Sequence, residues 1–371
     1  MVKKIVGLVV ILIALISAGS YYYYTSSIAQ GTASTQILES SISSVQLTQT
    51  TTGDQTSGQS LIAIDGAFAL YPLMVTWAQE YESINPNVKI QVSAGGAGKG
   101  MSDVLAGLVD IGMVSRSATQ SEINSGAYPI RVARAGAVAI VNANNPVLTS
   151  LLANGLSRST LQGIFIYGNV TTWGQATNNA LSPGNKIDTY TRSDSSGLAD
   201  TWAKFLGKSQ DDLLGVGVYG DPGMIQAVQS DPTAIGYANL VFAYDNSTGK
   251  QVDGIVVVPI DFNNNGRIDA NENFYSNLTS IDNAINTGAY PSPPAMDLFL
   301  VTKGIPIGAA RAFIVWVLTD GQQYVPKDGL ITIPSPALSQ ELTQLQNAST
   351  STATTTSTDE SSFAESPNIF R

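Results

Sequence analysis

Short apolar runs typical of β-strands alternate with helical patterns along residues 61–333. The strand patterns cover residues 61–64, 88–92, 137–141, 186–190, 234–237, 255–259 and 297–302. The helical patterns cover residues 70–83, 100–108, 159–166, 198–206, 224–230, 280–286 and 309–318. This alternation predicts an α/β fold with mostly parallel sheets, in which ligands bind at the carboxyl ends of the strands. A span of roughly 270 residues exceeds what one hydrophobic core usually covers, so we expect two lobes.

One of these strands, at residues 88–92, runs into a glycine-rich turn and then into a helix. The turn reads Ser-Ala-Gly-Gly-Ala-Gly-Lys-Gly at residues 93–100 and contains Lys99. It directs bare backbone N–H groups and the positive end of a helix toward one point, which suits an anion. A glycine-rich turn alone is a weak signal, and its interest comes from a second motif of the same kind.

The second motif is Arg-Ser-Asp-Ser-Ser-Gly at residues 192–197, between a predicted strand and a predicted helix. Arg192 offers a planar pair of donors for two oxygens of an anion, and Asp194 is close enough to hold it in place. A hydroxyl and two N–H groups at the helix start come from Ser196, Gly197 and Leu198. The residues alone fit a simple helix cap equally well.

The composition excludes several functions. The chain of 371 residues has no Cys, which excludes disulfides, thiolate metal sites, Cys nucleophiles and a lipid-modified cysteine. It has no His, so the usual general base and the usual zinc or copper ligand are missing, and we expect no enzyme. The net charge of −10 argues against nucleic acid as a partner. It does not exclude an anionic ligand, because distant surface charge is screened within about 10 Å.

The N-terminus resembles a membrane segment. Lys3 and Lys4 precede an apolar run at residues 5–16, and four tyrosines follow at residues 21–24. Basic residues keep that end in the cytoplasm, and tyrosines suit the far membrane interface. Residues 1–24 come close to the roughly 20 residues that span a bilayer, so we expect a signal anchor. Cleavage after Ala29 is the alternative, and both interpretations place the rest of the chain outside.

Two Ser/Thr-rich segments flank the predicted folded part. Residues 25–60 predict a flexible linker with an end-to-end distance of roughly 30–35 Å, and residues 347–371 form a similar tail. Acceptor sequences for N-linked glycans occur at Asn169, Asn246, Asn277 and Asn347. They agree with an outside location and, if used, would make the chain a glycoprotein.

Several motifs occur in the order found in the phosphate-binding proteins of ABC importers. They are the glycine-rich turn and residues 106–112, 192–197, 234–237, 290–302 and 309–322. Over residues 61–333 the chain therefore resembles this type II solute-binding protein family. The resemblance implies a two-lobed fold with hinge strands that closes on inorganic phosphate. It also implies an ABC permease in the membrane as the partner.

The resemblance further implies which residues hold phosphate. They are Gly66, Ala67 and Phe68 in a first loop; Gly98, Lys99 and Gly100 in a second; Ser115 and Arg116; and Arg192, Asp194, Ser196, Gly197 and Leu198 in a third. The second loop lacks the Ser hydroxyl that many members have. Ser115 stands where some members have an Asp that accepts the proton of the ligand, and Leu198 stands where many have Thr.

The cations in this set also have simpler interpretations. Lys99 fits a solvated lysine at the start of a helix. Arg116 fits an ion-pair partner of Asp110 or of another acid at the edge of a lobe. Arg131 and Arg134 flank a predicted strand, where a structural role is expected.

A separate motif at residues 261–272 matches the calcium-loop pattern at every diagnostic position. The predicted oxygen ligands are the side chains of Asp261, Asn263, Asn265, Asp269 and Glu272 and the carbonyl of Arg267. Gly266 would make the sharp turn and Ile268 would pack inward. A strand precedes the loop, so we expect half an EF-hand with a structural Ca²⁺ and no organic cofactor. An Asn/Asp-rich hairpin loop without metal is the alternative.

We therefore expect a membrane-tethered, monomeric phosphate-binding protein outside the cytoplasm. Residues 61–137 and 297–333 would form lobe 1, and residues 138–296 would form lobe 2, with hinge strands at 137–141 and 297–302. One alternative keeps this fold with another tetrahedral oxyanion, such as sulfate, molybdate, tungstate or arsenate. A second is a calcium-stabilised surface interaction protein with a vestigial cleft. An enzyme is the third, and it lacks an evident base near its serines.

Overall fold

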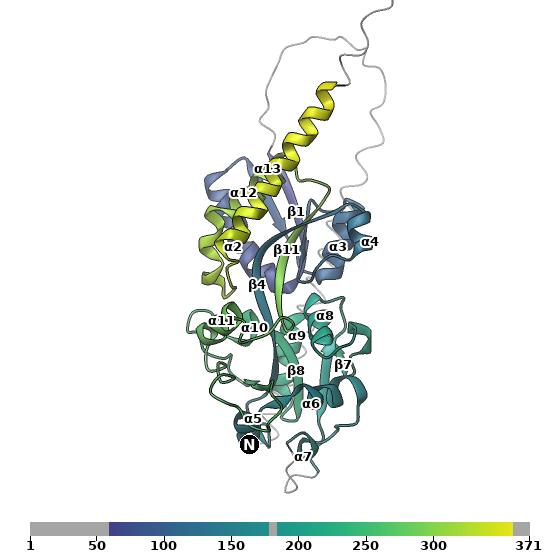
Figure 1. Ribbon diagram of the computed structural model, residues 1–371, viewed down its shortest axis with the longest axis vertical. Coiled ribbons are helices and arrows are strands. Elements are labelled where there is room, and N and C mark those ends of the chain that lie inside the picture. The colour runs from purple at the N-terminus through teal and green to yellow at the C-terminus, as the bar shows by residue number, and fades with distance from the viewer. Residues whose placement is uncertain (1–58, 178–183, 359–371) are drawn as a thin grey trace, which may run out of the picture. The chain divides into compact units, whose positions relative to one another are not determined.

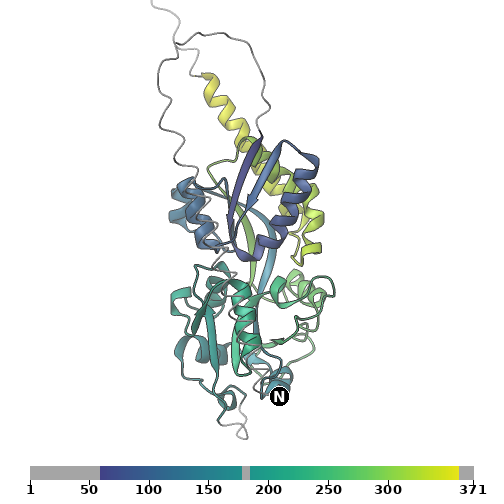
Figure 2. The same cartoon turned by 180° about the vertical axis from the view of Figure 1, so that it is seen from behind.

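The computed structural model describes residues 59–177 and 184–358, which form two lobes joined by two long strands (Figure 1). The predicted signal anchor and nearly all of the predicted linker lie outside the described residues. No helix in the described part of the chain is both long enough and apolar enough to cross a membrane. The two-lobed α/β architecture that the sequence predicts is confirmed. Figure 2 shows it from behind.

Lobe 1 is built on a sheet in the order β2-β1-β3-β11-β4. Its strands are β1 (Ser60–Gly66), β2 (Val88–Val92), β3 (Ile111–Val114), β11 (Ala295–Lys303) and the first part of β4 (Ala127–Asn142). Its helices are η1 (Phe68–Leu70), α2 (Tyr71–Ile84), α3 (Ala97–Ala106), α4 (Gln120–Asn124), α12 (Gly308–Leu318), η4 (Asp320–Tyr324) and η5 (Pro326–Asp328).

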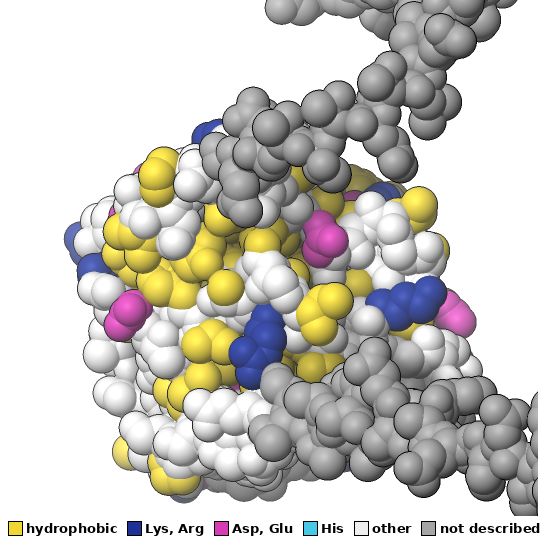
Figure 3. Space-filling model, turned by 90° about the horizontal axis from the view of Figure 1, so that it is seen from above, with side chains coloured by type: hydrophobic (Ala, Val, Ile, Leu, Met, Phe, Trp, Pro, Cys, Tyr) yellow, Lys and Arg dark blue, Asp and Glu magenta, His cyan; other side chains and the backbone are white. Residues whose placement is uncertain are grey.

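The lobe 1 helices lie on both sides of its sheet. Helices α2 and α12 lie together on one side and α3 on the other (Figure 1). Leu73, Trp77 and Tyr81 recur at helical spacing on α2 and are buried, which is the amphipathic pattern that fixes a helix on a sheet. The end of lobe 1 far from lobe 2 exposes hydrophobic side chains between separate charged ones (Figure 3).

Lobe 2 continues from the second part of β4. Its other strands are β5 (Leu156–Ser157), β6 (Asp188–Arg192), β7 (Val216–Val218), β8 (Ala234–Asn239), β9 (Ile255–Val258) and β10 (Ile260–Asp261). Its helices are α5 (Leu148–Asn154), α6 (Arg158–Gln162), η2 (Gly163–Tyr167), α7 (Trp173–Ala176), α8 (Gly197–Phe205), η3 (Gln210–Asp212), α9 (Gly220–Ser230), α10 (Leu240–Ala243) and α11 (Leu278–Thr287).

The two crossing strands, β4 and β11, make the sheets mixed rather than mostly parallel. In β4, Gly136 is the last residue paired with β11, opposite Ala295, and Ala137 is the first paired with β8, opposite Asn239. The flanking strands β1, β2, β3 and β6, β7, β8 pair in parallel, as the sequence predicts. The crossing strands run antiparallel to their neighbours because they carry the chain into lobe 2 and back.

The C-terminal helix α13 (Ser335–Thr358) corrects one expectation. The sequence predicts a flexible Ser/Thr-rich tail from residue 347, whereas the helix continues through its first part to Thr358. Leu345 is buried, and Leu338 and Leu342 pack against the core. We attribute the helical tail to this packed leucine face, because Ser and Thr themselves are mediocre helix formers.

Candidate functional site

The first predicted loop follows β1 and begins η1. Gly66 has a φ of 142°, and a β-carbon there would lie 2.2 Å from the carbonyl oxygen of Met113, so glycine alone fits this approach. The Ala67 N–H donates to the same carbonyl over 2.8 Å. The Phe68 N–H is the first of η1 and has no hydrogen-bond partner within residues 59–177 and 184–358. The first loop therefore offers one free donor, at Phe68.

The second predicted loop, the glycine-rich turn, spans the gap between the lobes. Its Gly95 and Gly96 N–H groups donate to the Gly66 carbonyl over 3.0 and 2.9 Å, which ties it to the first loop. The Gly98 N–H donates to the Ser195 carbonyl of lobe 2 over 3.0 Å. A β-carbon at Gly98 would lie 2.0 Å from Ser195 Oγ, so this approach depends on glycine. The predicted donor at Gly98 therefore joins the lobes instead of remaining free.

Lys99 and Gly100 are engaged within lobe 1. The Lys99 ammonium donates to the carboxylates of Asp103 and Asp65, and these hydrogen bonds raise its pKa above the ordinary value. The Gly100 N–H donates to the Gly96 carbonyl over 3.1 Å inside the first turn of α3. Lys99 was expected either to bind the anion or to be a solvated lysine at the start of a helix. The structure shows it at the start of a helix, paired with two carboxylates.

Arg192, at the end of β6, is held by two buried carboxylates. Its Nε and one terminal nitrogen donate to Asp194 over 2.8 and 2.7 Å, and the other terminal nitrogen donates to Asp221 over 2.6 Å. A guanidinium has five N–H donors, so two remain without a partner, one on each terminal nitrogen. Burial opposes the charge, yet Asp221 and Asp194 outweigh it and raise the pKa of Arg192 above its ordinary value. Arg192 therefore keeps its charge and presents a fixed pair of donors.

The third loop leads into the N-terminus of α8. The Ser196 hydroxyl caps this helix by accepting the Ala199 N–H over 3.3 Å, and the Ser196 N–H donates to Gln210 over 3.0 Å. The Gly197 and Leu198 N–H groups open the helix and have no partner in the described part of the chain. The cap interpretation and the anion interpretation are therefore both compatible with this helix start, because the cap leaves two donors free.

Contacts across the lobes bring these groups to one place. Ser115 follows β3, is 3% exposed, and its hydroxyl has no hydrogen-bond partner among the described residues. A β-carbon at Gly197 would lie 2.3 Å from Ser115 Oγ, so Ser115 contacts the start of α8. The Arg192 guanidinium lies 5.4 Å from the centre of the Phe68 ring. Free donors from both lobes thus lie at one interlobe position, which we call the candidate anion site.

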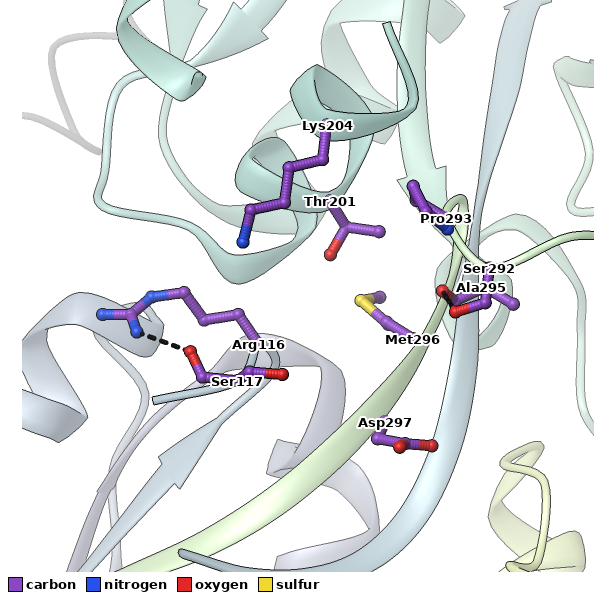
Figure 4. Close-up of a pocket in the computed structure, with 9 residues that line it drawn as sticks. All are labelled: Arg116, Ser117, Thr201, Lys204, Ser292, Pro293, Ala295, Met296 and Asp297. Carbon is purple, nitrogen blue, oxygen red and sulfur yellow. Dashed lines mark hydrogen bonds between the residues drawn. The ribbon is translucent and has the colours of Figure 1, made fainter. Parts of the chain in front are cut away.

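Arg116 is engaged in an ion pair within lobe 1. Its guanidinium donates to both carboxylate oxygens of Glu122 over 2.9 and 2.7 Å, and this pairing lowers the pKa of Glu122 to about 2. Arg116 also lines an open groove of about 190 Å³ between the lobes, where Thr201 and Lys204 of α8 lie opposite Arg116 (Figure 4). Of the two ion-pair partners expected for Arg116, Asp110 or another acid, the structure shows the second, which is Glu122.

The sequence did not predict two contributions to the candidate anion site, both from the start of α9. Asp221, which holds Arg192, is 1% exposed. Gly220 packs against the Phe68 ring, with a β-carbon position 3.0 Å from it, and the Tyr219 ring meets the same ring edge-on at 5.6 Å. The sequence offers one usable signal, an acid three residues before the helix predicted at residues 224–230, and nothing that points to Arg192; the observed helix begins earlier and has Asp221 in its first turn.

The comparison with known families decides the classification. Residues 48–321 match the PBP superfamily domain, which is most of the chain. The chain belongs to the PBP superfamily.

Two curated relatives carry the same printed name, Phosphate-binding protein PstS. The one from Methanocaldococcus jannaschii is 26% identical over 295 residues, covering 67% of this chain and 75% of the relative. The one from Xylella fastidiosa is 26% identical over 308 residues, covering 74% and 82%.

Among solved structures, a putative phosphate ABC transporter substrate-binding protein with bound phosphate from Clostridium perfringens is similar in fold. It has a TM-score of 0.60 and 22% identity, and covers 74% of this chain and 100% of its own. At this identity the likeness concerns the fold. The PBP superfamily is one of solute-binding proteins, which is not an enzyme class.

The predicted calcium loop of this PBP superfamily member follows β10 and is closed by its own hydrogen bonds. Asp261 accepts the Gly266 N–H over 2.8 Å, and Gly266 has a φ of 79°, as a sharp turn needs. Glu272 accepts the N–H groups of Phe262 and Asn263 over 3.0 and 3.1 Å. Asp261 and Glu272 are nearly fully buried.

The remaining predicted ligands of this loop lie at its exposed end. Asp269 accepts from the amide groups of Asn263 and Asn265 over 3.0 and 2.7 Å and from Arg267 Nε over 2.9 Å. In the part of the chain that is described, three or more Asp, Glu, His or Cys side chains nowhere gather closely enough to hold a metal. The loop therefore has the turn that the pattern predicts, with its carboxylates engaged by N–H groups.

Proposed function

We propose that this chain binds inorganic phosphate between its two lobes and delivers it to an ABC permease. The observation that carries the proposal is the set of unpartnered donors at the candidate anion site. They are the two remaining N–H groups of Arg192, the backbone N–H groups of Phe68, Gly197 and Leu198, and the Ser115 hydroxyl. Donors that converge at a helix start suit a small oxyanion.

The energetics agree with a functional affinity. A hydrogen bond to a charged group contributes roughly 1.5–3 kcal/mol, and micromolar binding needs about −8 kcal/mol. The free donors of both lobes exceed this requirement before the costs of ordering and desolvation. Because the donors come from both lobes, ligand binding would favour the closed state.

The names of similar proteins support phosphate over other oxyanions. Two relatives are named phosphate-binding proteins, and a protein of similar fold contains bound phosphate. That fold relative is named as a substrate-binding protein of an ABC transporter. Sulfate, molybdate, tungstate and arsenate are the competing ligands, and competition during phosphate binding separates them.

The first test replaces Arg192. Arg192→Ala is expected to weaken phosphate binding at least 100-fold in calorimetry, because it removes the paired donors and leaves the negative charges of Asp194 and Asp221 facing the ligand. Arg158→Ala removes an exposed arginine of the same lobe and is the matched control. Equal phosphate affinity in wild type and Arg192→Ala, with the variant folded by circular dichroism, would refute the site.

We also propose a structural Ca²⁺ at residues 261–272. The twelve-residue pattern and the Asp261–Gly266 turn support it. Binding requires Glu272 to exchange its backbone donors for the ion, so a modest affinity is expected. Added Ca²⁺ should raise the thermal midpoint of the EDTA-treated wild type by several degrees, and should leave Asp261→Asn unchanged. A wild-type midpoint that does not respond to millimolar Ca²⁺ excludes the site.

The remaining features of the proposal concern membrane attachment, oligomeric state, glycosylation and catalysis. We propose a membrane anchor within residues 1–24, a monomeric state, glycans at one or more of the four acceptor sequences, and no catalytic activity. The Lys3–Lys4 pair with the apolar run supports the anchor. The lack of His supports the absence of catalysis, and a phosphatase assay with and without Ca²⁺ checks it.

A further inference from the structure

Asp221 occupies an unexpected place beside the candidate anion site. It is 1% exposed, and its Oδ2 accepts one terminal N–H of Arg192 over 2.6 Å. Asp194 already pairs with Arg192 through two hydrogen bonds. Arg192 therefore faces two buried carboxylates, and their summed charge opposes an anionic ligand. A second carboxylate at this place needs a role that outweighs this electrostatic cost.

Both carboxylates are themselves held in place. Asp221 Oδ1 accepts the side-chain and backbone N–H groups of Asn239, at the end of β8, over 2.7 and 3.2 Å. Asp194 Oδ1 accepts the Gly220 N–H over 3.1 Å. The chain around Arg192 is thus fixed from β8 and from the start of α9, so the guanidinium has little freedom to turn.

The donor geometry shows what this fixation achieves. Asp194 binds the side of the guanidinium that carries Nε, and Asp221 binds the opposite terminal nitrogen. One N–H therefore remains without a partner on each terminal nitrogen. These two donors can bind two oxygens of one tetrahedral anion, which a tilted guanidinium could not do equally well.

We propose that Asp221 is a positioning residue that orients the free donors of Arg192 toward the ligand. The nature of the ligand rests on the proposed function, whereas the orientation itself does not. The neighbours of Asp221 extend the same role to lobe 1, because Gly220 and Tyr219 contact the ring of Phe68, whose N–H is a predicted ligand donor. The start of α9 thus contacts residues that carry donors of both lobes.

The test separates positioning from charge and from general stability. Asp221→Asn is expected to weaken phosphate binding at least tenfold in calorimetry, although removing a negative charge near an anion should strengthen it. Asp253→Asn removes an exposed carboxylate of the same lobe and is the control. In an Arg192→Lys background, which lacks the paired donors, Asp221→Asn is expected to change affinity less than threefold, because nothing remains to be oriented.

Each outcome decides the proposal. Unchanged or tighter phosphate binding by Asp221→Asn overturns it, and so does an equal loss in both backgrounds, which would indicate a structural role. If Asp221→Asn does not fold, Asp221→Glu keeps the charge and displaces the carboxylate, and undiminished affinity in that variant overturns it.

If wild type binds no phosphate, the proposed function fails and a ligand-free crystal structure of Asp221→Asn decides this proposal. A guanidinium that has turned supports the positioning role, and an unmoved one contradicts it.

Discussion

Asp282, on α11, is a residue whose chemistry is set by burial alone. Its Oδ1 is buried without a hydrogen-bond partner, and burial raises its pKa from 3.8 to about 7. Between about pH 4 and 7 the folded chain retains a proton that the unfolded chain releases, so the free energy of unfolding falls as pH rises through this window.

Asp282→Asn is expected to remove this pH dependence. At pH 8 the variant should be more stable than wild type by about 1–3 kcal/mol, and at pH 3.5 the two should be alike. Denaturant unfolding at both pH values measures the difference, with Asp253→Asn as an exposed control. A variant that is less stable than wild type at pH 8 would show that the carboxylate has a favourable partner.

Single residues of the site were predictable to the extent that their chemistry is local. Arg192, Ser196 and Gly197 sit in one six-residue motif, and the structure places free donors there. Lys99 binds Asp65, which lies far away in the sequence, and Asp221 reaches Arg192 from another element. Such pairings depend on which strands are neighbours, and no local pattern in the chain contains that information.

At the scale of elements, the start of α8 is in close contact with the end of β3. A β-carbon at Gly197 would lie 2.3 Å from Ser115 Oγ and 2.6 Å from the Ser115 carbonyl oxygen. The carbonyl belongs to the backbone of the other lobe and cannot rotate away. The absence of a side chain at Gly197 is therefore a condition for closure, in addition to the free N–H that it offers.

Gly197→Ala is expected to hold the lobes apart while leaving each lobe folded, because alanine suits a helix. Phosphate affinity should fall at least tenfold, and small-angle scattering in excess phosphate should retain the larger radius of gyration of the open state. Gly223→Ala is the control, because its β-carbon would meet nothing closer than 3.9 Å. Wild-type affinity in Gly197→Ala would mean that closure does not require this contact.

The sequence predicted the elements better than their pairing. The parallel strands at the flanks follow from alternation with helices, whereas the antiparallel course of β4 and β11 depends on the chain crossing between lobes twice. The helical part of the tail was missed because its Ser/Thr composition disfavours a helix and the packed leucines precede it.

At the scale of the whole molecule, the predicted anchor would hold the two lobes at a membrane surface. The full chain is expected to float with lipid vesicles in a density gradient, whereas a chain of residues 59–371 should remain in the soluble fraction. The apolar run at residues 5–16 is the physical reason. A mass that shows loss of residues 1–29 from the mature protein would favour the cleaved form, and a full chain that does not float would exclude the anchor.

The paired crossing of β4 and β11 has a thermodynamic consequence. Two strands are paired up to Gly136 and Ala295. We expect such a paired connection to restrict the ways in which the lobes can turn relative to each other. Each approach of the lobes therefore returns them to nearly the same alignment. Bringing two lobes together around a solute costs orientational entropy. Here much of that entropy has already been lost when the chain folds, so less is lost when the solute binds. More of the interaction free energy then remains available as affinity.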